Sequence, residues 1–176
     1  MKLIHGRLSN DILIKGIKLA IAPKETPPFA VEVMVFEEDT NLVLTVDPIK
    51  EYALEHPIRT MTDIMNATKH QLGTVVTNGN SWYAVVIDLD SEPICRQEWC
   101  EEALEKILQL VKKTGVMSLA LPILGTGHGN LQVELLLPGL IKKLSTGKIG
   151  VLKYIWLIAP CRDVKRVREI MNGIPS

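Results

Sequence analysis

Aromatic residues are scarce in this chain, making up 5% of its 176 residues. Hydrophobic residues nevertheless account for 47%, so a sizeable core is expected and must be built mainly from valine, isoleucine, leucine and methionine. A chain of this composition is not expected to be disordered. Its length favours one domain of ordinary size. We therefore expect a single domain that spans residues 1–176.

The sequence has no excess of either charge, since 20 lysines and arginines balance 20 aspartates and glutamates. Proteins that bind polyanions are usually more basic, so neither DNA nor RNA is expected as a partner. No stretch approaches the roughly 18–20 apolar residues of a membrane span. Residues 1–6 lack the apolar core of a signal peptide. These features predict a cytoplasmic protein that has no membrane partner.

Cysteine and histidine are few and scattered. The chain holds Cys95, Cys100 and Cys161, and His5, His56, His70 and His128. An odd number of cysteines argues against a disulfide framework and favours a reducing compartment. No spacing among these residues resembles a metal-ligand set, so the sequence predicts neither a metal site nor a cofactor.

The amino-terminal part, residues 1–46, is predicted to be rich in β-structure. Short apolar or alternating runs indicate strands at residues 11–14, 17–22, 31–36 and 42–46. The last two flank an acidic segment, residues 37–41, and are expected to form a hairpin. Two helices are then expected, one from Asp47 to the region of Pro57 and one over residues 61–72.

Strands and helices alternate after residue 73. Strands are expected at residues 74–77, 82–89, 116–121 and 154–159, and helices at 98–113, 131–144 (with a kink or break at Pro138) and beyond Asp163. Such alternation predicts an α/β fold with a mixed, mainly parallel sheet and helices on both faces. Ligands of these sheets bind beyond the carboxyl ends of the strands.

A glycine-rich loop follows the expected strand at 116–121. Its six candidate ligand-binding residues are Gly125, Thr126, Gly127, His128, Gly129 and Asn130. Glycines let the backbone approach an anion, and N–H groups at the start of the next helix supply donors. We therefore predict a site for a phosphate or diphosphate. The alternative is a tight turn in which the glycines serve geometry alone.

Other residue types suggest structural roles. The loop is not a Walker motif, and no nucleophile elbow or Ser/His/Asp pattern is present, so no catalytic residue is assigned. Asp88 and Asp90 are expected to be solvated. Trp82 is expected to be half-buried in a strand and Trp99 to lie in the core. A basic cluster is expected on a solvated helix face; it comprises Arg162, Lys165, Arg166 and Arg168.

Residues 118–130 resemble a macro domain: a strand of small and apolar residues, a proline, and a Gly-Thr-Gly loop that opens a helix. The resemblance extends over residues 61–171. It implies a three-layer α/β/α sandwich that binds ADP-ribose or a related nucleotide, with the loop at Gly125–Asn130 wrapped around the diphosphate. The chain departs from the family where Arg7 follows Gly6, in place of an adenine-binding aspartate. It also departs at residues 31–48, in place of an asparagine-containing segment and a first glycine loop.

Three functions remain open at this stage. The first is a binding module for a phosphate-containing ligand such as ADP-ribose or a related nucleotide. The second is an enzyme that hydrolyses an ADP-ribosyl or phosphate ester. The third is a structural or oligomerisation domain that keeps the fold without the ligand, and a homo-oligomer is one form it could take.

Overall fold

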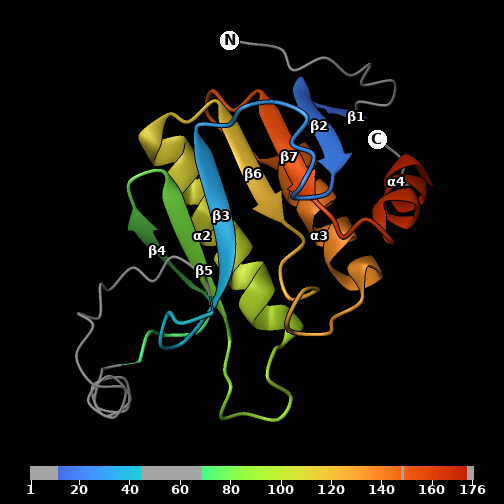
Figure 1. Cartoon of the computed structure of the whole chain (residues 1–176). Coiled ribbons are helices and arrows are strands. Elements are labelled where there is room, and N and C mark those ends of the chain that lie inside the picture. Colours follow the sequence, from blue (N-terminus) through green and yellow to red (C-terminus); the bar gives the residue numbers. More distant parts are fainter. Residues whose placement is uncertain (1–11, 45–68, 148, 174–176) are drawn as a thin grey trace.

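The fold is built on one seven-stranded sheet (Figure 1), seen in a computed structural model that describes residues 12–44, 69–147 and 149–173. The strands are β1 (Ile12–Ile14), β2 (Ile17–Ala22), β3 (Val33–Asp39), β4 (Thr74–Asn78), β5 (Ser81–Ile87), β6 (Ser118–Pro122) and β7 (Tyr154–Ile158). The helices are α2 (Gln97–Thr114), α3 (Val133–Thr146) and α4 (Val164–Gly173). The strand order is β1-β2-β7-β6-β3-β5-β4.

The sheet is mixed and mainly parallel, as the sequence predicts. Strand β2 pairs in parallel with β7, β7 with β6, β6 with β3, and β3 with β5. Antiparallel hairpins, β1–β2 and β4–β5, form the two edges. The β4–β5 turn passes through Gly79 at a φ of 56°, a conformation that glycine adopts without steric cost.

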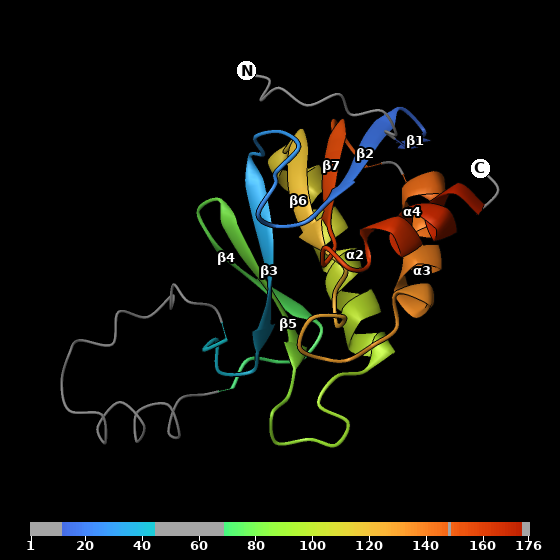
Figure 2. The ribbon, with the colours of Figure 1, turned by 45° about the vertical axis from the view of Figure 1, so that its right-hand side comes forward.

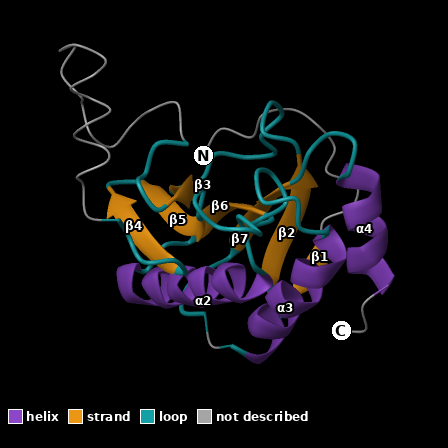
Figure 3. Ribbon diagram, turned by 90° about the horizontal axis from the view of Figure 1, so that it is seen from below, coloured by secondary structure: helices purple, strands orange, loops and turns teal. Residues whose placement is uncertain are grey.

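Helices α2 and α3 lie side by side on one face of the sheet, and α4 lies beside its β1–β2 edge (Figures 2 and 3). Helix α2 packs on β5 and β4, and α4 packs on α3 and β2. The helix predicted from Asp47 lies outside the described residues, as does most of the one predicted over 61–72. Residues 69–72 are described and are not helical. None of the described helices is long and apolar enough to cross a bilayer.

Helix α2 forms because apolar residues recur at helical spacing. Its buried side chains are Cys100, Ala103, Leu104, Ile107 and Val111. The helix ends at Gly115, which has a φ of 72° and donates its N–H to the carbonyl of Val111. Trp99 was expected in the core but is half-buried on the flank of the helix, where the Arg96 guanidinium lies 5.2 Å from its ring. Trp82, expected half-buried, is buried in β5.

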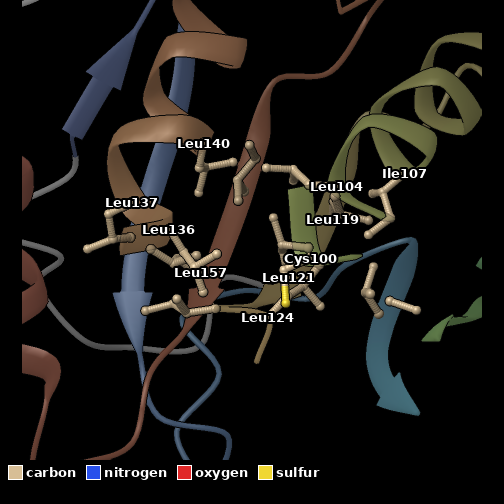
Figure 4. Close-up of a cluster of buried hydrophobic side chains, with 14 of the residues drawn as sticks. Cys100, Leu104, Ile107, Leu119, Leu121, Leu124, Leu136, Leu137, Leu140 and Leu157 are labelled. Atoms are coloured by element: carbon tan, nitrogen blue, oxygen red, sulfur yellow. The ribbon is translucent and has the colours of Figure 1, made fainter. Parts of the chain in front are cut away.

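The main core fills the space between α2, α3 and the sheet (Figure 4). Leu137 of α3, Leu119 of β6 and Leu157 of β7 are fully buried there. Helix α3 continues through Pro138 as one helix, so the expected division at this proline does not occur. Its buried face offsets the hydrogen bond that a proline removes.

The hairpin predicted around residues 37–41 is wrong. Strand β3 extends from Val33 to Asp39 and pairs in parallel with β5 and β6, while residues 42–44 are not in a strand. The apolar run at the start of β3 suits an interior strand that is covered on both faces. Glu38 is buried, and its carboxylate accepts the N–H of Leu44 at 3.0 Å, which holds the chain just after the strand.

Candidate functional site

A cleft with a volume of about 720 Å³ lies at the carboxyl ends of the central parallel strands. The chain segments that follow β2, β6 and β7 line it, together with side chains of β3 and β5. This volume is within the roughly 300–1,000 Å³ that small-molecule sites occupy, and the position is where α/β sheets bind ligands. The cleft is therefore the candidate binding site.

The six predicted loop residues divide into two groups. Thr126, Gly127 and His128 line the cleft, whereas the residues that line it do not include Gly125, Gly129 or Asn130. Gly127 and His128 are exposed. Ligand binding by all six remains a prediction.

Gly125 and Gly129 are required by packing. Gly125 is buried at a φ of 77°, and a β-carbon there would lie 2.7 Å from Leu131 and 2.8 Å from Cys100. A β-carbon at Gly129 would lie 2.5 Å from the β-carbon of Cys95. At these two positions the geometric interpretation of the glycines therefore holds.

Thr126 fixes the turn at the start of the loop. Its backbone N–H donates to the carbonyl of Ile123 at 3.2 Å, and its hydroxyl donates to the same oxygen at 2.6 Å. The Leu131 N–H closes the loop by donating to the carbonyl of Gly125 at 3.0 Å. The donors of Thr126 are engaged within the protein, and the His128 N–H faces the carboxyl of Glu37. Gly127 is therefore the residue of this group that is better placed to meet a ligand.

Glu37 of β3 points into the cleft beneath the glycine loop. Its side chain is 7% exposed, and its Oε2 lies 3.6 Å from Nδ1 of His128. Burial raises the pKa of the Glu37 carboxyl, and the backbone N–H groups of His128 and Gly125 partly offset that rise. Its Oε1 is buried and has no hydrogen-bond partner among the described residues.

The strand pairing explains how Glu37 reaches the loop. Strand β3 pairs with β6 only at Val33 and Met34, but it follows β5 as far as Asp39, with a bulge after Glu38. Strands β3 and β6 therefore separate toward their carboxyl ends, and the Glu37 side chain lies where they part. The sequence did not single out Glu37; the signal for it was an apolar run that leads directly into acidic residues at the ligand edge.

Aromatic rings form another wall of the cleft. Phe36 of β3 and Tyr83 of β5 stack with ring centroids 5.5 Å apart and planes at 22°. The ammonium group of Lys24 lies 5.7 Å from the centroid of Phe36. Rings of this kind offer a flat apolar surface, and the lysine offers a positive charge for an anion.

The other polar candidates of the sequence have structural partners. Asp88 accepts the N–H of Asp90 at 3.2 Å and the hydroxyl of Ser91, and this hydroxyl lowers the pKa of Asp88. Asp90 pairs with Lys69. In the basic cluster, Arg168 donates to the carbonyl of Ile21 at 3.1 Å, Arg166 pairs with Glu134 and Arg162 with Asp163. Across the residues that the structure describes, no cluster of histidine, cysteine or acidic side chains could hold a metal ion.

Comparison with known proteins finds similarity in structure alone. No family model matches the sequence, and no curated protein matches it. A macrodomain of Oceanobacillus iheyensis, crystallised with ADP, is 19% identical; the match covers 93% of this chain and 94% of that one, with a TM-score of 0.66. A Trypanosoma brucei macrodomain in complex with ADP is 13% identical over 86% of this chain and 68% of its own, with a TM-score of 0.57.

A third solved structure agrees with these two. The macrodomain of Thermus aquaticus DarG is 19% identical over 81% of this chain and 98% of its own, with a TM-score of 0.55. The chain therefore has the macrodomain fold. The α/β architecture expected from the sequence is confirmed, including the resemblance first seen at residues 118–130.

Proposed function

We propose that the cleft binds a phosphate-containing nucleotide, such as ADP-ribose or a close relative. The observation that carries the proposal is the cleft itself, which opens at the carboxyl ends of β2, β3, β6 and β7 and is lined by the glycine loop. Two solved structures that share the fold, from Oceanobacillus iheyensis and Trypanosoma brucei, were crystallised with ADP. Their ligands support the assignment of this chain to the same class of binding module.

The two sides of the cleft suit the two parts of such a ligand. The exposed Gly127 can approach phosphate oxygens, because glycine has no side chain to keep an anion away. The stacked pair of Phe36 and Tyr83 offers an apolar surface for a sugar or base, and Lys24 adds a positive charge. The ligand would lie across the cleft between these features.

Titration calorimetry with ADP-ribose tests the proposal, with ADP and AMP as shorter relatives. Binding is expected for the wild type and should fall at least about tenfold for Gly127→Val, whose side chain would enter the cleft and crowd Glu37. Gly139→Ala is the matched control, because Gly139 lies in α3 and outside the cleft. Gly139→Ala should bind like the wild type.

Two results would replace this function with one of its rivals. A domain that keeps the fold without a ligand would give no heat with any of these nucleotides at millimolar concentration. A hydrolase would release ADP-ribose from an ADP-ribosylated protein faster than the background rate. Binding without turnover is the outcome that the proposal expects.

A further inference from the structure

The carboxyl group of Glu37 lies where an anion is expected to bind. A β-carbon at Gly127 would stand 3.0 Å from its Oε2, so the carboxyl is against the most open part of the loop. It also faces the backbone N–H groups of Gly125 and His128. An anionic ligand held by this loop would therefore come into contact with a resident carboxylate.

Two like charges in contact within a half-enclosed cleft repel each other, and burial weakens the solvent screening between them. The Glu37 side chain is more than nine-tenths buried, and its Oε1 has no hydrogen-bond partner among the described residues. Buried polar atoms are normally hydrogen-bonded, so a buried atom that lines a ligand site and lacks a partner is expected to find one on the bound ligand. A phosphate oxygen can only accept a hydrogen bond, so Glu37 would have to donate one.

The other ionisable groups around Glu37 do not cancel its charge. His128 is the nearest, at 3.6 Å, but its imidazole is 57% exposed and only attracts the carboxylate when it is protonated. The thiols of Cys95 and Cys100 face Glu37 from the chain before and within α2. Lys24 and Glu25 line the cleft after β2 with opposite charges.

We propose that Glu37 determines the specificity of the cleft by binding an anionic ligand in its protonated form. On binding, the Glu37 carboxylate takes one proton from solution, and the resulting carboxylic acid donates its O–H to a phosphate oxygen. No bond to phosphorus forms or breaks. This inference rests on the proposed function, because it concerns the same site and the same class of ligand.

The raised pKa of Glu37 agrees with this inference. Burial is its main cause, and a bound phosphate would raise the pKa further, because it adds a negative charge beside the carboxyl. A carboxylic acid that its surroundings keep neutral can act as a hydrogen-bond donor. The cleft therefore holds ligand and proton together, and its affinity for an anion depends on pH.

Calorimetry of ADP-ribose binding between pH 5 and pH 8 tests the inference. At pH values where the free Glu37 carboxyl is ionised, binding must take up one proton. The affinity should therefore fall about tenfold for each unit by which the pH rises. Titrations in buffers of different ionisation enthalpy should report uptake of about one proton. Glu37→Gln, which carries a neutral donor, should bind with an affinity independent of pH and at least about tenfold more tightly than the wild type at pH 8.

Two control variants isolate the role of Glu37. Glu25→Gln removes an exposed carboxylate from the same cleft and should keep the pH dependence. His128→Gln removes the imidazole that lies 3.6 Å from the Glu37 carboxyl, and it should also keep the pH dependence. Thermal unfolding of each variant, followed by circular dichroism, confirms that the fold is retained.

The outcomes separate this inference from the proposed function. Wild-type affinity that does not change with pH, together with weaker binding by Glu37→Gln, would overturn the inference and leave the proposed function standing. Loss of the pH dependence in His128→Gln would assign the proton to His128 and also overturn it. Binding by Glu37→Gln but not by the wild type would support the inference. No binding by the wild type or by Glu37→Gln at any pH would overturn both the inference and the proposed function.

Discussion

Glu37 and Gly127 face each other across the gap between β3 and the glycine loop, with 3.0 Å between Oε2 of the glutamate and the place that a β-carbon would take at position 127. One residue is an acid on a central strand whose side chain is 7% exposed, and the other is an exposed glycine on the loop after β6. This arrangement brings together the glycine loop, which the sequence analysis identified as a candidate site, and the carboxyl end of β3, which it did not identify. The predictions for Glu37 therefore concern its effect on stability as well as the specificity that we propose for the cleft.

Glu37→Gln is expected to stabilise the protein at neutral pH. Burial raises the pKa of Glu37 above its ordinary value of 4.5, so the folded state binds this proton more tightly than the unfolded state. The contribution of the carboxyl to stability is complete below the unfolded-state pKa and is lost as the pH rises through the folded-state pKa. Urea unfolding should therefore show the variant to be more stable than the wild type at pH 7, with a smaller difference at pH 4.

The exposed Glu25→Gln serves as the control for this experiment and should leave the stability unchanged at both pH values. A Glu37→Gln variant that is less stable than the wild type at pH 7 would contradict the prediction. It would mean that the loop N–H groups stabilise the charged carboxylate more than burial opposes it.

Substitution of two glycines by alanine should change the stability in opposite directions. Gly139 lies inside α3, and a β-carbon there would be 4.0 Å from an oxygen of Glu101. Gly139→Ala should therefore gain about 0.5–1 kcal/mol. Gly129→Ala would place a β-carbon 2.5 Å from Cys95 and 2.7 Å from the carbonyl of Gly125. This overpacking should cost about 1–3 kcal/mol. Chemical denaturation measures both, and equal effects would be inconsistent with the loop packing.

The sequence predicted those elements whose signal is local. The spacing of apolar residues in α2, the pair of strands expected at 74–77 and 82–89, and the buried runs of β6 and β7 each depend on neighbours in the chain. The partner of β3 depends on residues far away: Met34 lies opposite Ser81 on one side and Ala120 on the other. An acidic segment after an apolar run resembles a hairpin turn until those long-range pairs are known.

The candidate site was predictable to a similar extent. The glycine loop stood out because glycine is the residue that backbone strain and close packing select, and it does line the cleft at Gly127. Glu37 could not be recognised as part of the same site, because its position depends on how β3 and β6 separate. Lys24 and Tyr83 likewise enter the cleft only through the order of the strands.

Leu137→Ala should destabilise the protein by about 2–5 kcal/mol, because it opens a cavity in the core between α3 and the sheet. Leu135 provides a matched control on the same helix, since it is 45% exposed. Leu135→Ala should change the free energy of unfolding by no more than about 0.5 kcal/mol. Urea denaturation of both variants measures the difference, and similar losses would place the buried face of α3 elsewhere.

The three cysteines should differ sharply in their reactivity with thiol reagents. Cys161 is exposed, whereas Cys95 and Cys100 are buried beneath the glycine loop with their sulfur atoms 3.6 Å apart. The pKa of Cys100 is raised mainly by the hydrogen bond with Cys95 and secondarily by burial. Cys100 therefore supplies little thiolate at neutral pH. In the native protein one thiol per chain should react quickly with a disulfide reagent at pH 7.5, and all three should react in urea. Cys161→Ser should abolish the fast reaction, whereas a fast reaction of Cys95 or Cys100 would show that the loop opens readily.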